Sequence, residues 1–301
     1  MSTLAGVTRI AYRRRASPLH ATRAPIAAAY GAALAGSALL VENPVLLGAL
    51  LIAVLVAASA AHVARQLYSA VRLTALPVIG LIVLVNVLDS RGGLTVFARL
   101  GDWGVLGQVN LTVEAVVYGL IVALRLLIVM LVCVLVVCAA DPDELLLACR
   151  RISPRSALTA TLATRLMPVL GQDAMRLAEA QRCRPDGGAR GIRGRLAIMR
   201  ATIGGALDRS LDVAAVLEMR GYGARGRTRA SRRVLSRHDL AFTASAVAVL
   251  ALSLLALIAG VGSFQIYPLV HLTLPLSGVA IAVLTLAVAL APFLDRRGIT
   301  P

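Results

Sequence analysis

The chain has 301 residues, of which 58% are hydrophobic and only 15% are charged. Its mean hydropathy of +0.82 is typical of proteins that cross a membrane several times, and it excludes an ordinary soluble protein of two domains. The net charge of +16 comes from 31 basic and 15 acidic residues, and every basic residue is arginine. A chain without lysine cannot contain a Walker-type phosphate loop, so we do not expect it to hydrolyse ATP by that route.

The arginines lie between and outside the apolar runs, as expected of loops that stay in the cytoplasm. We expect four segments to face the cytosol: residues 1–23, 62–72, 140–239 and 295–301. Nucleic-acid binding is another common cause of such a charge, but no recognition motif accompanies these arginines. The four cysteines form no CxxC pair, and we expect neither a metal site nor another cofactor.

Residues 1–23 form a basic arm, and residues 24–140 contain four apolar runs that predict membrane spans. The predicted spans are about 24–41, 45–61, 73–88 and 113–140. The first two are close to the lower length limit of about 17 residues, and Glu42-Asn43-Pro44 between them predicts a turn on the outside. The segment between the third and fourth spans, residues 89–112, is expected to be an outer loop, with Trp103 favoured at the membrane interface.

Arg125 lies near the middle of the fourth predicted span. An ionisable residue at such a depth has either a functional or a structural role. We favour the structural role, in which the side chain faces the interior of the helix bundle and pairs with a carbonyl or an acid from another helix.

Residues 141–238 differ from the rest, since 19 of the 31 arginines lie between residues 140 and 239. Asp141-Pro142-Asp143-Glu144 predicts a helix start, with Asp141 as N-cap and proline at the first helical position. Three cytosolic helices are predicted, at about 144–151, 154–182 and 195–219. Pro168 is expected to interrupt or kink the second helix, and Gly221 to end the third. The arginine-rich residues 225–237 form a basic cluster that anionic lipid would attract.

Two further spans, at about 240–261 and 272–294, complete the prediction. The fold class is therefore an all-α integral membrane protein of about six transmembrane helices, with both termini in the cytoplasm. We divide it into a basic arm (1–23), spans one to four (24–140), a cytosolic block of three helices (141–238), and spans five and six with a short tail (239–301).

Two short sequences follow the second and third block helices: Cys183-Arg184-Pro185 and Met219-Arg220-Gly221. A guanidinium group at the tip of a helix offers five donors in a fixed fork, which suits a groove lined by carbonyl or carboxylate groups. Two such tips suit a partner with two equivalent grooves, such as a nucleotidase dimer. Each arginine taken singly is also consistent with a solvated helix cap favoured by the helix dipole.

With these motifs, the chain resembles the transmembrane T component of energy-coupling factor transporters, the EcfT/CbiQ family. Ser17-Pro18-Leu19-His20 and Asp141–Leu145 resemble family segments, and Arg165-Leu166-Met167-Pro168 resembles the family's Arg-aromatic-x-Pro element with leucine in place of the aromatic residue. The two arginine tips resemble the family's Ala-Arg-Gly tips. Alanine is replaced at both tips, and Pro185 stands in place of glycine at the first.

The resemblance implies a non-enzymatic transporter subunit of a prokaryotic cell membrane. Two ABC-type ATPase subunits would bind the block helices, and a small membrane-embedded S component would carry the substrate, a vitamin or a transition-metal ion. Closure of the ATPase dimer would move the arginine-tipped helices and tilt the S component. Membrane lipid is an expected partner, and nucleic acid is not.

Two other classes of protein are alternatives: the permease of a conventional ABC importer and a membrane-bound enzyme. The permease of a conventional ABC importer contacts its ATPases through one short loop in each subunit, which the long block with two arginine tips disfavours. A membrane-bound enzyme would need a polar catalytic set at the bilayer surface, and the sequence contains no such motif.

Overall fold

The computed structural model describes residues 15–89, 96–102, 108–149, 153–183, 191–222, 224, 235–261 and 276–295. The chain divides into two compact units. The first, which we call the membrane unit, comprises Met1–Leu145 and Leu235–Pro301. The second, which we call the insert, is Leu146–Val234 and interrupts the membrane unit.

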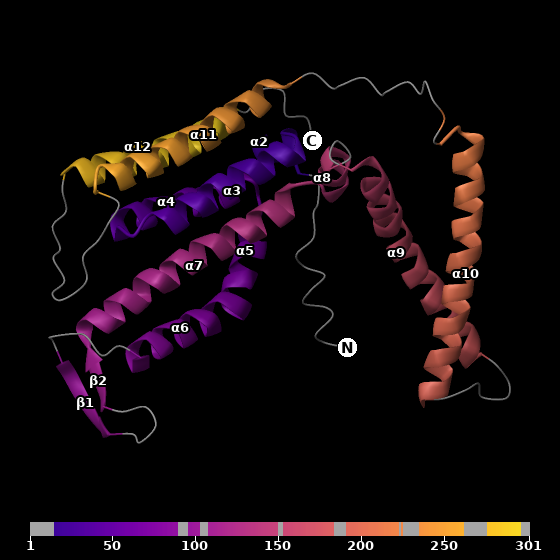
Figure 1. The fold of residues 1–301 in the computed structure, drawn as a ribbon, viewed down its shortest axis with the longest axis horizontal. Coiled ribbons are helices and arrows are strands. Elements are labelled where there is room, and N and C mark those ends of the chain that lie inside the picture. Colours follow the sequence, from indigo (N-terminus) through magenta and orange to yellow (C-terminus); the bar gives the residue numbers. More distant parts are fainter. Residues whose placement is uncertain are drawn as a thin grey trace. The chain divides into compact units, whose positions relative to one another are not determined.

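The described elements of the membrane unit are mostly apolar helices (Figure 1). In chain order they are α2 (Pro18–Ala21), α3 (Ala24–Leu40), α4 (Pro44–Ala60), α5 (Ala64–Ala70), a π-helical turn (Val71–Ala75), α6 (Leu76–Asp89), strands β1 (Val96–Asp102) and β2 (Gln108–Thr112), α7 (Val113–Ala139), α11 (Arg237–Ile258), α12 (Leu276–Leu290) and a 3-10 turn (Ala291–Phe293). Helix α8 (Pro142–Cys149) begins in this unit and ends in the insert.

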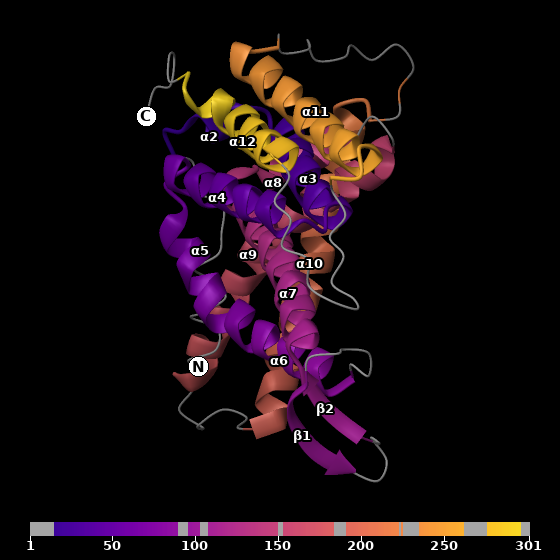
Figure 2. The same ribbon diagram turned by 90° about the vertical axis from the view of Figure 1, so that its left-hand side faces the viewer.

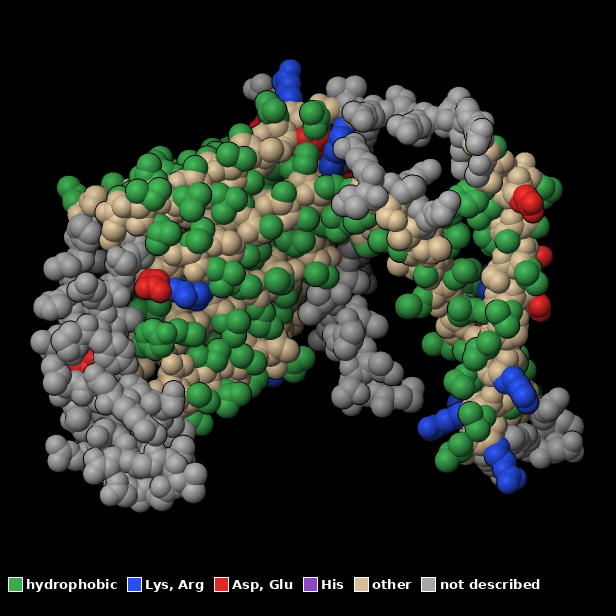
Figure 3. Space-filling model, in the orientation of Figure 1, with side chains coloured by type: hydrophobic (Ala, Val, Ile, Leu, Met, Phe, Trp, Pro, Cys, Tyr) green, Lys and Arg blue, Asp and Glu red, His purple; other side chains and the backbone are tan. Residues whose placement is uncertain are grey.

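Among the described residues, four helical stretches are long and apolar enough to cross a membrane: Ala64–Asn86, Glu114–Ala139, Arg237–Ile258 and Leu276–Phe293. Helices α3 and α4 are apolar but have only 17 residues each, or about 25 Å at 1.5 Å per residue. Hydrophobic side chains cover much of the visible face of the membrane unit (Figure 3). The all-α membrane fold predicted from composition is therefore confirmed.

Local signals in the sequence explain where several of these helices begin. Asn43 caps α4 by accepting a hydrogen bond from the Val45 N–H at 3.0 Å, and Pro44 takes the first helical position. Ser236 and Asp239 form a reciprocal capping box at the start of α11. Asp141 caps α8 by accepting from the Asp143 N–H at 2.9 Å, as predicted.

The helical stretch of the third span begins earlier than predicted, at Ala64 rather than near Leu73. Nothing in residues 64–72 breaks a helix, so the helix continues through a segment that the charge pattern had suggested was a connector. Pro77 has no N–H for the helix ladder, and a π-helical turn at Val71–Ala75 lies directly before it. Such turns change the hydrogen-bond register, and this one allows the helix to pass the proline.

Within the expected outer loop, the described residues form an antiparallel pair of strands. Val96 pairs with Thr112 and Arg99 with Asn110, with irregular register between the paired segments. Residues 108–112 (Gln-Val-Asn-Leu-Thr) alternate polar and apolar side chains, the period-two pattern of a strand. That short signal was missed, and Trp103 lies outside the described residues.

Helix α3 is central to the packing of the membrane unit. It packs against α11 on one side and α7 on the other, while α4 packs against α12 and α7 (Figures 1 and 2). Gly31 allows the close approach of α3 to α7, because a Cβ atom there would collide with the Val136 side chain. Helix α6 packs on α7, and its large side chains are mostly exposed.

An aromatic cluster joins α3, α11 and the 3-10 turn. The Tyr30 and Phe242 rings meet edge to face with centroids 5.2 Å apart, and Phe242 and Phe293 meet similarly at 5.1 Å. The Tyr30 hydroxyl donates to the Ala289 carbonyl at 2.8 Å, which satisfies a polar group that is buried in the core. These contacts hold three segments of distant sequence in one arrangement.

Replacement of Phe242 by alanine should destabilise the membrane unit. Because lipid is itself apolar, the loss comes mainly from the cavity, which we expect to cost about 2 kcal/mol or more. Leu254→Ala is the control, since Leu254 lies on the same helix and is 47% exposed. Thermal unfolding of the purified protein in detergent should show a clear decrease for Phe242→Ala only. Equal decreases would show that the cluster is not a packing centre.

Candidate functional site

The described part of the insert consists chiefly of two long helices, α9 (Pro154–Arg182) and α10 (Gly191–Met219), of 29 residues each. Each is about 43 Å long. They pack on one another and run in roughly opposite directions (Figure 1). The bounds of α9 are as predicted, and α10 begins four residues earlier than predicted, at Gly191 with a φ of +70°.

An ion pair between described residues joins the two helices. Arg209 Nη1 of α10 donates to Asp173 Oδ2 of α9 at 3.1 Å, and both side chains are about one-third exposed. The pair lies 182 − 173 = 9 residues before the end of α9 and 219 − 209 = 10 residues before the end of α10. These distances correspond to about 14–15 Å along each helix. The pair therefore lies nearly midway between two helix ends that point in opposite directions.

Sequence reasoning missed this pair, because an aspartate and an arginine on two different helices give no local signal that they meet. Asp173 and Arg209 are 36 residues apart, as are Arg184 and Arg220 (220 − 184 = 36). The shared offset means that each tip arginine follows its member of the ion pair by 11 residues in the sequence. The packing of α9 on α10, which only the structure shows, brings Asp173 and Arg209 together.

The second arginine tip has a well-defined backbone. Gly221, with a φ of +72°, donates to the Glu218 carbonyl at 2.9 Å, and Tyr222 donates to the Leu217 carbonyl at 2.9 Å. These are the two bonds of a Schellman motif, and they make Arg220 the C-cap residue. Its side chain and that of Met219 are exposed. The site thus presents a cation at the negative end of a helix dipole.

The first tip is described only in part. Helix α9 ends at Arg182, and the Cys183 N–H donates to the Glu179 carbonyl at 3.1 Å. Cys183 is exposed. Arg184 and Pro185 lie outside the described residues, so their role stays a prediction.

Arg165 and Pro168 lie inside α9, both exposed, and far along the helix from its tip. The helix was expected to be interrupted or kinked at Pro168, and it continues through this residue without interruption. Proline removes one backbone hydrogen bond from the ladder, and the long helical runs on both sides of it maintain the helix.

Helix α10 carries an apolar stripe that no described part of the insert covers. Six large side chains recur along it at three- and four-residue intervals, and each is more than half exposed: Ile192, Leu196, Met199, Ile203, Leu207 and Leu211. A continuous exposed stripe of this kind marks a surface for a protein or membrane partner.

Comparison with known protein families supplies the decisive observation. Residues 16–230 match the family described as CbiQ, cobalt transport protein. The match covers 230 − 16 + 1 = 215 of the 301 residues. The chain belongs to the CbiQ family. A search of curated proteins returned no match.

Membership of the CbiQ family makes this protein a membrane component of a cobalt or energy-coupling factor transporter. The matched range contains both long helices of the insert, the Asp173–Arg209 pair and both arginine tips. It ends before α11, which packs on α3, and α12, which packs on α4 in this CbiQ protein.

Arg125 of α7 reaches the turn between α3 and α4. Its Nη2 donates to the Val41 carbonyl at 3.1 Å and lies 3.7 Å from Glu42 Oε1. The Arg125 side chain is 23% exposed and that of Glu42 is 58% exposed. The arginine therefore contacts both a carbonyl and an acid at the end of α3, and its role as a structural partner stays our proposal.

Arg125→Leu should lower the thermal stability of the CbiQ protein in detergent. The loss of a charge-assisted bond to the Val41 carbonyl is expected to cost about 1.5–3 kcal/mol. Glu42→Gln should cost less, at most about 1 kcal/mol, because the exposed partner is screened and the bond to Val41 remains. If Arg125→Leu is as stable as the parent protein and yet abolishes transport, the structural role is wrong.

Proposed function

We propose that this CbiQ protein is the transmembrane coupling subunit, or T component, of an ATP-driven energy-coupling factor importer. One observation carries the proposal: an ion pair joins α9 and α10 nearly midway between the C-terminal ends of the two helices, Arg182 and Met219. Two ends at equal distances from a common centre suit a partner with two equivalent grooves. An ABC-type ATPase dimer is such a partner, and it would hydrolyse ATP in chains separate from this one.

The two tips would act as plugs in the ATPase grooves. Cys183-Arg184-Pro185 forms one tip, and Met219-Arg220-Gly221 forms the other. Each guanidinium would donate to carbonyl or carboxylate groups of its groove, a contact that the planar fork makes better than a lysine does. The Schellman motif at Gly221 supports this role for Arg220, because it holds the last turn of α10 in a defined conformation.

A small membrane-embedded S component would hold the transported substrate, a transition-metal ion or a vitamin. The apolar stripe on α10 supports contact with such a protein, since six large side chains there are exposed. When the ATPase dimer closes, the tips would move and the stripe would carry the S component with it. Cobalt is the first substrate to test, since the family is described as a cobalt transport protein.

The proposed setting is a prokaryotic plasma membrane, crossed about six times with both termini in the cytoplasm. The arginine distribution supports it, because residues 140–239 alone hold 19 of the 31 arginines. In this arrangement residues 1–23 are a cytosolic arm, residues 24–140 and 239–301 supply the spans and a short tail, and residues 141–238 are the cytosolic block.

The proposal is tested by the variants Arg184→Glu, Arg220→Glu and the double variant. Each variant should insert into the membrane normally. Each lost bond is expected to cost about 1.5–3 kcal/mol, which corresponds to roughly ten- to hundredfold weaker binding of the ATPases. Arg→Lys should restore little at either tip. The measurements are the ATPases retained when the tagged chain is purified from membranes, and uptake of labelled cobalt ions by cells that express the transporter.

Arg176→Glu is the matched control, because it makes the same charge change at an exposed position of α9 before the tip. It should retain the ATPases. If the double variant also retains them and transports normally, the arginines are only helix caps and the proposal fails.

A charge exchange tests the ion pair between the helices. Asp173→Arg or Arg209→Asp alone places like charges where the pair now lies, and the combination restores an opposite pair. Because the side chains are about one-third exposed, the expected change in the free energy of unfolding is at most about 1 kcal/mol. Uptake should nevertheless decrease severalfold in each single variant and recover in the double variant. A double variant no better than either single variant would exclude a role for the ion pair.

A further inference from the structure

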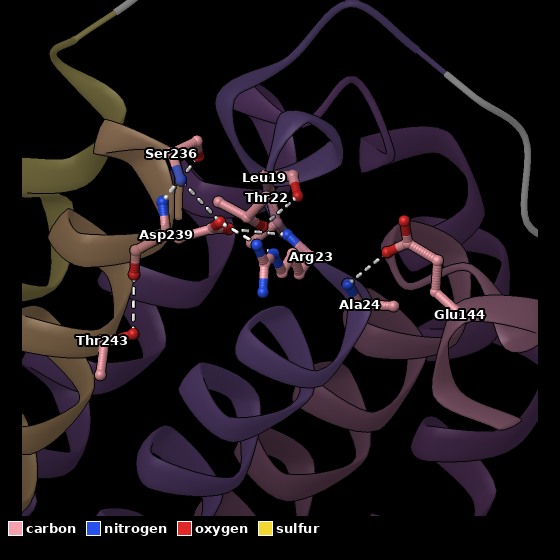
Figure 4. A network of polar contacts seen from close by, with 8 residues as sticks. All are labelled: Leu19, Thr22, Arg23, Ala24, Glu144, Ser236, Asp239 and Thr243. Atoms are coloured by element: carbon pink, nitrogen blue, oxygen red, sulfur yellow. Dashed lines mark hydrogen bonds and ion pairs between the residues drawn. The ribbon is translucent and has the colours of Figure 1, made fainter. Parts of the chain in front are cut away.

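The first turn of α3 is a meeting point of segments that lie far apart in the sequence. The N–H of Arg23, the N-cap residue, donates to Asp239 Oδ1 at 2.9 Å. The next N–H, that of Ala24, donates to Glu144 Oε2 at 2.9 Å. Figure 4 shows the two carboxylates approaching the helix start from opposite sides. Early helical N–H groups have no acceptor within their own helix, so these carboxylates satisfy them and oppose the positive end of the helix dipole.

Asp239 is an unusually well-anchored member of this network. It is 2% exposed, and its second oxygen accepts from the Ser236 N–H at 2.9 Å and lies 3.3 Å from Arg23 Nε. Three donors thus converge on two oxygens. An amide offers only one acceptor oxygen, so asparagine at this position cannot satisfy all three donors.

Glu144 and Asp239 lie close to the two points at which the chain leaves and re-enters the membrane unit. The insert leaves the membrane unit after Leu145 and returns at Leu235. Glu144 is therefore the second-last residue of the membrane unit before the insert, and Asp239 lies four residues after the return (239 − 235 = 4). Both connections to the insert are thus bonded, through a carboxylate, to adjacent residues of one helix end.

The helix that receives these bonds is tightly packed. Helix α3 contacts α11 through the Tyr30–Phe242 ring pair and approaches α7 closely at Gly31. Close-packed elements transmit displacement rather than absorb it. A movement of the two connections would therefore displace α3 and, with it, the helices on either side.

We propose that Glu144 and Asp239 are positioning residues that transmit movement of the insert to α3. This inference rests on the proposed coupling function and adds where the movement enters the membrane unit. Without the two bonds, nothing would tie the first turn of α3 directly to the first turns of α8 and α11, and a movement of the insert would reach α3 only through the packed helices. With them, both connections and α3 move together.

The test uses the complex of the full chain with its ATPases in lipid nanodiscs. Hydrogen exchange is followed by mass spectrometry in peptides covering α3, α9 and α10, with and without a non-hydrolysable ATP analogue. In the parent complex, the analogue should change exchange in all three helices. In Asp239→Asn and Glu144→Ala, the changes in α9 and α10 should persist, and the change in α3 should fall at least threefold.

Two further variants separate transmission from stability. Glu144→Gln keeps an acceptor oxygen for the Ala24 N–H and should behave like the parent. Asp143→Asn removes a carboxylate from the neighbouring residue of α8. Because the Ala24 N–H donates to Glu144, this variant should also behave like the parent. Glu144 is only partly buried, so Glu144→Ala remains informative even if Asp239→Asn folds poorly.

The outcomes distinguish this inference from the proposed function. If the parent chain does not retain ATPases, the proposed function itself fails. If the parent responds and both loss variants keep the full response in α3, the inference is overturned. It is also overturned if the variants lose their ATPases, because the two acids would then serve assembly rather than transmission.

Discussion

The start of α3 is the constraint on which the membrane unit depends. A helix that begins in the interior of a bundle must find acceptors for its first N–H groups, and here two carboxylates from distant segments supply them. Because Asp239 is almost fully buried, its charge is tolerable only with the three donors that surround it. The bonds therefore determine where α8 and α11 begin relative to α3, and the aromatic cluster and the close approach at Gly31 then hold α3 against its neighbours.

The insert is held together by different interactions from those of the membrane unit. The described side chains of its two long helices bury little apolar surface, and a partly exposed ion pair joins them near the midpoint between their C-terminal ends. Such a pair contributes little to stability, but it opposes sliding of one helix along the other. A pair of helices that is lightly packed, has equal arms and carries an exposed apolar stripe is suited to bind partners and to move with them. This is the property that the coupling role proposed for this CbiQ protein requires.

Much of the fold was predictable because its signals are local. Membrane spans depend on runs of apolar residues, and helix starts depend on caps such as Asn43 and Asp141, whose partners lie two residues away. The bounds of α9 followed from Ser153-Pro154 and from the end of its helical pattern. The start of the third span was missed because arginines were taken to mark a connector, although a charged residue does not by itself end a helix. The strand pair was missed because five alternating residues are a weak signal.

The sequence by itself determined the fold class, the helices of the insert and the position of Arg220 at a helix end with Gly221 beyond it. It also indicated that Arg125, in the middle of an apolar run, needs a partner, without naming one. Tertiary structure alone decided that the partners are the Val41 carbonyl and Glu42, that Asp173 faces Arg209, and that Glu144 and Asp239 meet at α3. The physical reason is range: caps and apolar periodicity act over a few residues, whereas these pairs join residues 36 to 216 positions apart and depend on how whole helices pack.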